Sequence, residues 1–259
     1  MAGMRNPAED SGVQPRPITV PCQQCPLRRL EVFRPFSETE LAFIAGFKAG
    51  ELNVAAGHDL LLTGNNSPHV YTLLRGWAFR YVLLEDGRRQ ILNFVLPGDF
   101  LGLQTSVFEV MEHSVQALTD VQLCLFPRAR LWDLYREQPG LGFDVTWLAA
   151  HEESLVDENL ASVGQRSALE RMAFLILHIV QRIDGLGLVR NDACEFPLTQ
   201  QHIADAMGLS LVHTNKTLRR LVRDGYAEIG GGKLRIRKRR ALERLAGQAP
   251  GPQRLRPLI

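Results

Sequence analysis

The chain has 259 residues, 45% of them hydrophobic, and a formal net charge of only +2. This length holds one large or two modest domains with real cores, and no stretch approaches the roughly 18 uninterrupted apolar residues that a membrane span needs. The N-terminus carries acids and prolines where a secreted chain would carry an apolar signal core, so we expect a cytoplasmic protein that does not enter a membrane.

The charge is unevenly distributed. Residues 216–244 hold 11 Lys/Arg against 3 Asp/Glu, a local balance of +8, so the remainder of the chain carries about −6. A basic cluster of this kind suits the neutralisation of phosphates. A solvated surface would explain scattered charges better than it explains this cluster.

The N-terminal part predicts a disordered tail followed by a β-rich domain. Residues 1–20 are rich in Pro, Gly and polar side chains. From residue 52 to about 127, short apolar runs alternate with turn signals, and Asp86-Gly87 joins runs 77–84 and 90–95 as a hairpin. Regularly spaced short strands are typical of a β-sandwich or a rolled barrel, which we assign to residues 21–138.

Residues 139–164 are predicted to form one long amphipathic helix. Its apolar stripe consists of Leu141, Val145, Leu148 and Leu155, spaced by 4, 3 and 7 residues. Spacing near 3.5 suits a dimerisation seam between two such helices. The same stripe would equally well cover the β-domain.

The C-terminal part, residues 165–247, predicts a helix-turn-helix with a wing. An apolar helix over 167–183 should be buried there. Thr199 can cap a helix that Gly208 ends, and Ser210 can cap the next. In this second helix Leu211, Leu218, Leu221 and Val222 share one side, whereas Val212, Lys216, Arg219 and Arg223 share the other.

A short helix with an apolar back and a basic front suits a DNA major groove. An ordinary helical hairpin with a solvated charged face is the alternative on these residues alone. Residues 233–237, after three glycines, complete a hairpin wing, and 239–245 form a last short helix. The proline-rich residues 248–259 are predicted to be disordered.

The order of a β-roll, a long helix and a winged helix-turn-helix resembles the Crp/Fnr superfamily of bacterial transcription regulators. The strings LLRGWAFRY, LPGDFLGL, ALTDVQLCLFP and IADAMGLSLVHTNKTLRRL carry the resemblance. The fold class is therefore α+β: a jelly-roll-like sensor domain, a dimerisation helix and a winged helix-turn-helix domain. The resemblance implies a homodimer on palindromic double-stranded DNA, with half-sites roughly 34 Å apart, and RNA polymerase as a partner.

The resemblance also assigns the DNA contacts. Val212, His213 and Lys216 are placed to touch base edges. Family members often carry Glu and Arg at the places of Val212 and Lys216, so the preferred half-site does not follow from the family. The residues expected to hold phosphates are Ser210, Arg219, Arg220, Arg223, Lys233 and Arg235.

The cyclic-nucleotide branch of the family is a poor match. Leu103 stands where the resemblance places a ribose-binding Glu, and His113 where it places a phosphate-binding Arg. A pocket without these partners would neutralise a phosphate poorly. We therefore exclude ordinary cAMP sensing, while a different effector in the pocket near residues 98–114 stays open.

The oxygen-sensing branch, whose members hold a [4Fe–4S] cluster, is a better match. Cys22 and Cys25 form a CxxC motif and Cys124 occupies the place of the distant ligand, but Glu31 stands where a third N-terminal cysteine is expected. Three thiolates and a carboxylate can ligate iron, so we predict gating by oxygen or redox state. A lone CxxC also suits a dithiol switch, half a zinc site or a vestigial site.

Two further possibilities complete the sequence-based expectations. Cys194 is expected in a loop before the helix-turn-helix, as a bystander. A cupin-like enzyme would need a His/Glu metal set on the strands, and the HxH…H pattern is missing from the sequence. We therefore predict that the protein is not an enzyme.

Overall fold

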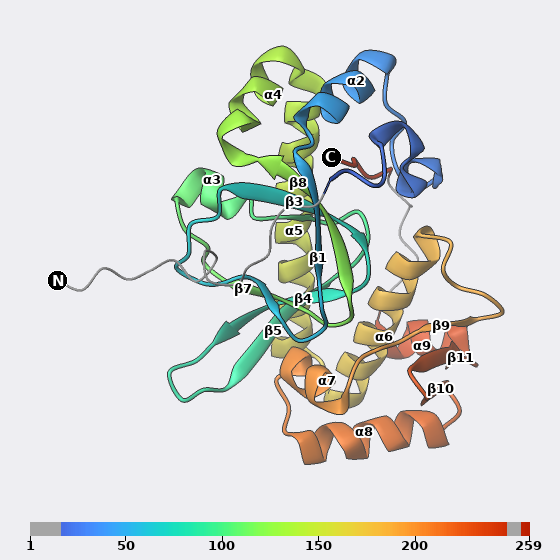
Figure 1. Cartoon of the computed structure of the whole chain (residues 1–259). Coiled ribbons are helices and arrows are strands. Elements are labelled where there is room, and N and C mark those ends of the chain that lie inside the picture. The colour runs from blue at the N-terminus through green and yellow to red at the C-terminus, as the bar shows by residue number, and fades with distance from the viewer. Residues whose placement is uncertain (1–16, 248–254) are drawn as a thin grey trace.

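The computed structural model describes residues 17–247 and 255–259 (Figure 1). The predicted tail residues 1–16 and 248–254 lie outside the described residues. No helix of the described part is long and apolar enough to cross a membrane. Thr19 and Val20, which belong to the predicted tail, contact Glu51 of the domain: the Thr19 hydroxyl donates to its carboxylate, and the Val20 amide donates to Oε1 at 2.9 Å.

The N-terminal segment forms two 3₁₀ turns and a helix before the sheet begins. These are η1 (Cys22–Gln24), η2 (Pro26–Arg29) and α2 (Glu38–Phe47). Ser37 and Glu40 form a reciprocal capping box at the start of α2. The sequence analysis did not identify α2, although its S-x-x-E signature stands in the sequence.

Two four-stranded antiparallel sheets build the predicted β-roll. One has the order β1-β8-β3-β6 and the other β2-β7-β4-β5. The Asp86-Gly87 turn joins β4 to β5 as predicted, with Ala78 opposite Val95. The strands are β1 (Gly50–Val54), β2 (Asp59–Leu61), β3 (His69–Arg75), β4 (Ala78–Leu83), β5 (Arg89–Val95), β6 (Phe100–Leu101), β7 (Ser114–Ala117) and β8 (Val121–Pro127).

One short helix, α3 (Gln104–Phe108), lies within the roll, between β6 and β7. After β8, η3 (Arg128–Arg130) and α4 (Leu131–Glu137) lead to the predicted long helix, α5 (Pro139–Gln165). The four residues predicted as the dimerisation seam, Leu141, Val145, Leu148 and Leu155, are buried within the single chain. Leu141, Val145 and Leu148 belong to the chain's own hydrophobic core, which is the arrangement that the sequence left open beside a dimerisation seam.

The free face of α5 carries other apolar residues. Phe143 and Leu160 are each 70% exposed. Helix α5 therefore carries apolar residues on two sides. The spacing of the apolar residues in the sequence cannot tell which side packs on the roll and which is left for a partner helix.

The C-terminal domain follows the predicted order. Its elements are α6 (Ala168–Gly185), β9 (Ala193–Glu195), α7 (Gln200–Met207), α8 (Leu211–Arg223), β10 (Ala227–Gly230), β11 (Lys233–Ile236) and α9 (Arg239–Ala246). Helix α6 is buried almost continuously from Met172 to Val180, as its composition predicts. Cys194, expected in a loop, instead lies in β9 opposite Leu234, and is buried.

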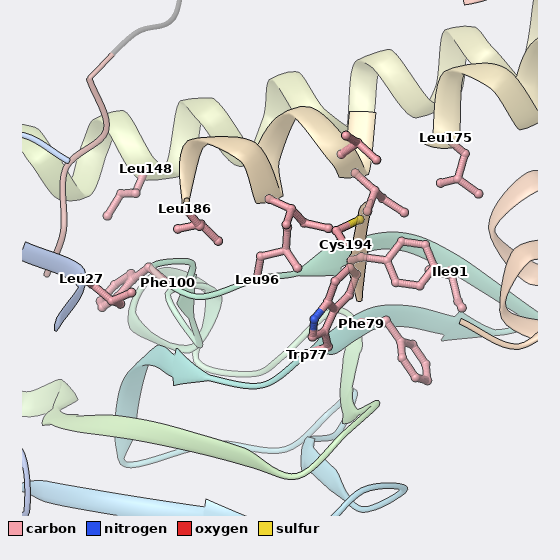
Figure 2. Close-up of a cluster of buried hydrophobic side chains, with 14 of the residues drawn as sticks. Leu27, Trp77, Phe79, Ile91, Leu96, Phe100, Leu148, Leu175, Leu186 and Cys194 are labelled. Atoms are coloured by element: carbon pink, nitrogen blue, oxygen red, sulfur yellow. The ribbon is translucent and has the colours of Figure 1, made fainter. Parts of the chain in front are cut away.

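One hydrophobic core joins the roll to the C-terminal domain. Figure 2 shows Trp77 of the roll beside Cys194 of the C-terminal domain, and Phe79, Ile91 and Leu175 belong to the same cluster of buried residues. Polar contacts reinforce this interface: Arg89 Nε lies 2.8 Å from Asp205 Oδ2 on α7, and Gln90 Nε2 donates to the Ala206 carbonyl at 3.3 Å. The two domains therefore pack as one body.

A buried carboxylate, Asp99, ties three parts of the chain together. It follows β5 in the Pro97–Gly98 turn, and its carboxylate pairs with Arg182 of α6 and with Arg256, whose Nη2 is 2.6 Å from Oδ1. Residues 255–259, predicted to be disordered, thus lie packed against the roll. Leu258 and Ile259 are 2% and 3% exposed. Apolar side chains and one arginine anchor this segment despite its proline content.

Replacing Asp99 with Asn should destabilise the protein by about 3 to 5 kcal/mol, because two buried guanidinium groups would lose their anion. Urea denaturation of the full chain measures the loss. Asp86→Asn is the matched control: Asp86 is paired with Arg88 on an exposed turn and should change the midpoint little. Equal midpoints for both variants would contradict the role of Asp99.

Candidate functional site

Helix α8 presents its basic side to solvent at the end of the molecule opposite α2 and α4 (Figure 1). The Ser210 hydroxyl accepts from the His213 amide at 3.2 Å and so caps α8, as predicted. Thr199 caps α7 in the same way, and Gly208 ends α7 with φ +64°. These local signals set the sharp turn between α7 and α8.

The residues predicted to contact bases lie together on the first turns of α8. Val212 is 80% exposed, and His213 and Lys216 are also exposed. Because these three side chains stand clear of the core, they are free to meet a partner surface.

Most of the predicted phosphate-contact residues share this surface. Arg219, Arg220, Arg223 and Lys233 are exposed, and Ser210 is exposed with its hydroxyl used as the cap. Arg220 and Arg223 lie 3.6 and 3.3 Å from the Asp224 carboxylate. Arg235 is half-buried and donates to the Asn191 carbonyl at 2.9 Å, which ties this side chain to the domain.

The back of α8 differs from the sequence-based prediction. Leu221 is fully buried, but Leu211 and Val222 are 42% and 38% exposed. Two threonines, Thr214 and Thr217, fill the buried side instead. Thr214, Thr217 and Leu221 follow one another at spacings of three and four residues, so the helical period of the sequence already places the two threonines on the side of Leu221.

The wing is a tight hairpin of β10 and β11. Gly231 and Gly232 both have positive φ, at 58° and 71°, as a two-residue type I′ turn requires. The structure adds β9 as a third strand beside β11. The wing places Lys233 at its tip, opposite Gly230.

The three cysteines singled out in the sequence come together. Cys22, Cys25 and Cys124 line one cavity of about 20 Å³, which we call the thiol cavity. Cys22 and Cys25 lie at the two ends of a 3₁₀ turn in which the Cys25 amide donates to the Cys22 carbonyl at 3.3 Å. Side chains three residues apart lie over one another in such a turn, so the two thiols share one side.

The thiol cavity combines burial with positive charge. Burial raises the pKa of Cys22, and raises that of Cys124 to about 11, so both hold their protons at neutral pH. Lys48, itself buried, pairs with Glu51 at 2.6 Å beside them. Arg28 also lines the cavity, and its Nε has no hydrogen-bond partner among the described residues.

A [4Fe–4S] cluster, which the resemblance implies, does not fit this arrangement. The thiol cavity is large enough for about one water molecule. Glu31, the predicted fourth ligand, is exposed and does not line it. Within residues 17–247 and 255–259, no group of three or more His, Cys, Asp or Glu side chains is placed to hold a metal.

A second, larger pocket of about 640 Å³ lies between the roll and α5. Leu103 and His113 line it, together with Arg80 and Arg256. Burial, and secondarily Arg80, lowers the pKa of His113 to about 3, so this imidazole is neutral where a phosphate would need a cation. The lining is otherwise largely apolar, with Phe100, Met111 and Leu148 among its residues.

Comparison with known families matches two parts of the chain. Residues 51–138 match the model of the cyclic nucleotide-binding domain, and residues 170–245 match that of the Crp-like helix-turn-helix domain. These segments coincide with most of the roll and of the C-terminal domain.

Individual relatives extend the similarity over most of the chain. The nitrogen fixation regulation protein FixK of Bradyrhizobium diazoefficiens is 31% identical over 212 residues, which are 82% of this chain and 88% of FixK. The transcriptional activator protein FnrL of Cereibacter sphaeroides is 28% identical over 81% of this chain and 85% of FnrL. The solved structure of FixK2 from Bradyrhizobium japonicum superimposes with a TM-score of 0.69 and 25% identity, covering 78% of this chain and 98% of FixK2.

Proposed function

The chain belongs to the Crp/Fnr family of transcription regulators, and we propose that it is a homodimer that reads palindromic double-stranded DNA and responds to redox state. The family consists of regulators and not of enzymes. The observation that carries the proposal is the exposed basic side of α8, held on a domain that shares one core with the sensor roll. Contact with RNA polymerase and a cytoplasmic location stay predictions from the resemblance and the sequence.

Sequence reading and affinity are divided between two sets of residues. Val212, His213 and Lys216 stand at the N-terminal end of α8, the end that enters a major groove in helix-turn-helix proteins. Val212 offers an apolar contact and Lys216 a donor. Arg219, Arg223 and Lys233 surround them and would hold phosphates, which adds affinity without sequence information.

Dimerisation is assigned to the free face of α5. Phe143 and Leu160 are exposed there, whereas Leu141, Val145 and Leu148 of the same helix are buried in the core. Large apolar side chains exposed along one helix are typical of an interface with a second copy.

The proposed gate is the thiol set Cys22, Cys25 and Cys124. Two thiols can form a disulfide by losing two protons and two electrons to an oxidant such as hydrogen peroxide, which becomes two waters. Since the thiol cavity does not fit an iron–sulfur cluster, we propose that oxidation of the thiols themselves is the signal. Arg34, nine residues after Cys25, pairs with Asp144 of α5 and lies 2.9 Å from Glu40 of α2. A rearranged CxxC turn would therefore reach the dimerisation helix.

A second candidate gate is an effector in the larger pocket. Its volume of about 640 Å³ is that of a small-molecule site. Its neutral His113 and the apolar Leu103 favour a largely apolar effector over a phosphate ester.

Lys216→Ala should reduce discrimination between the operator and random DNA by about 1 kcal/mol, because a base-edge donor is lost. Arg223→Ala should weaken binding to both DNAs alike, and it should lower the slope of log affinity against log salt concentration by about 1. Titrations at several salt concentrations measure both effects. Equal losses on operator and random DNA from both variants would contradict the division of roles.

Phe143→Glu should raise the dissociation constant of the dimer at least about 30-fold, because a charge would enter an apolar interface. Sedimentation velocity over a concentration series measures it. Leu83→Glu, which alters an apolar residue on β4 that is 62% exposed, is the matched control and should leave the dimer intact. A Phe143→Glu dimer as tight as the control would refute the assigned face.

Peroxide should lower operator affinity about 5- to 150-fold, the usual range of coupling between two sites. Cys22→Ser should abolish this response, whereas Cys194→Ser, in β9 away from the thiol cavity, should retain it. DNA titration before and after oxidation measures the coupling. A Cys22→Ser protein that still responds to peroxide would exclude the thiol gate, and iron with sulfide bound through Cys22 after anaerobic purification would replace it with a cluster.

A further inference from the structure

The C-terminal segment, residues 255–259, lies against the N-terminal turns of the sensor domain and away from α9 (Figure 1, dark red beside the blue N-terminal turns). Its backbone pairs in parallel with the strand-like residues after η2. The Arg256 amide donates to the Val32 carbonyl and the Arg34 amide donates to the Arg256 carbonyl, both at 2.8 Å. The segment is thus docked by directional hydrogen bonds as well as by packing.

The apolar end of the segment forms a wall of the thiol cavity. Leu258 and Ile259 line this cavity together with Cys22, Cys25 and Cys124. The Thr72 hydroxyl of β3 donates to the Ile259 carbonyl at 2.6 Å, which fixes the end of the segment over β3. By contrast, Leu255 at the start of the segment is 58% exposed.

The middle of the segment reaches the other cavity. Arg256 pairs with Asp99 at 2.6 Å, packs against the Phe33 ring and lines the larger pocket. Five residues therefore touch both places where the protein could receive a signal. An occupant of the larger pocket would meet the one side chain that anchors the segment to the Asp99 carboxylate.

We propose that the C-terminal segment is an internal ligand of the sensor domain that closes the thiol cavity and controls access to its two buried thiols, Cys22 and Cys124. With the segment docked, the cavity holds about one water molecule, so a reagent larger than water reaches the buried thiols of Cys22 and Cys124 only after the segment leaves. Because five residues can detach without disrupting either β-sheet, this opening costs less free energy than global unfolding.

The consequence for regulation rests on the proposed redox gate, but the shielding itself does not. If the segment controls access, then whatever detaches it, including an occupant of the larger pocket that displaces Arg256 from Asp99, makes the thiols reactive. Shielding is measured on the thiols alone, without DNA. A failure of the redox gate and a failure of the shielding are thus distinguishable.

The test is the rate at which iodoacetamide alkylates each cysteine of the reduced full-length protein, followed by mass spectrometry. Leu258→Glu should accelerate alkylation of Cys124 about tenfold or more, because burying one leucine is worth more than a tenfold change in an equilibrium constant. Leu255→Glu, which places the same charge at the exposed start of the segment, should leave the rate unchanged. Leu258→Met should restore slow alkylation.

Cys194 is the internal reference, because it is buried in β9 and does not line the thiol cavity. If Leu258→Glu accelerates the alkylation of Cys194 as well, the whole chain is opening. The milder variants Leu258→Ala and Arg256→Gln then test whether the alkylation of Cys124 is accelerated while that of Cys194 stays slow. Acceleration of Cys124 with unchanged Cys194 supports the proposal. The proposal would be overturned if, in every variant whose Cys194 is still alkylated slowly, Cys124 is alkylated at the same rate as in the parent protein.

Discussion

The arrangement of the whole molecule depends on one buried carboxylate. Asp99 accepts from the Leu96 amide at 2.9 Å within its own turn and pairs with Arg182 and Arg256. The two guanidinium groups hold the pKa of Asp99 far below its ordinary range against the opposing effect of burial. The turn itself is tight: Gly98 has φ +90°, and a Cβ there would lie 2.3 Å from the Phe33 ring. One anion in this turn thereby fixes α6 and the C-terminal segment on the roll.

A shared core follows from that constraint. Because α6 is held at the roll, its apolar side packs on Trp77 and Phe79, and α7 meets β5 through Asp205 and Ala206. The recognition surface of α8 is then positioned by the sensor domain and is not carried on a loose linker. A signal can act on α8 only by changing a packed interface, and such interfaces switch between discrete arrangements.

The two cavities beside Asp99 differ in chemistry but share neighbours. The larger pocket has a neutral His113 and mostly apolar walls, whereas the thiol cavity places three thiols near Lys48 and Arg28. Arg256 lines the larger pocket and Leu258 lines the thiol cavity, so a change in either cavity acts on the same segment, residues 255–259. The roll matches the cyclic nucleotide-binding domain, and its larger pocket is lined by the apolar Leu103 and by His113, whose lowered pKa leaves the imidazole neutral.

The sequence by itself determined the elements whose causes are local. The caps Thr199 and Ser210, the Asp86-Gly87 hairpin and the glycine wing predicted the recognition unit and much of the roll, because capping, turn chemistry and periodicity act within a few residues. The capping box of α2 was equally local and was overlooked. Only the tertiary structure decided which side of α5 covers the roll, that Cys194 joins a strand, that Glu31 lies away from the thiols and that residues 255–259 are docked. Each of these depends on partners distant in the chain, and a side chain's own neighbours in sequence do not specify which buried surface it will meet.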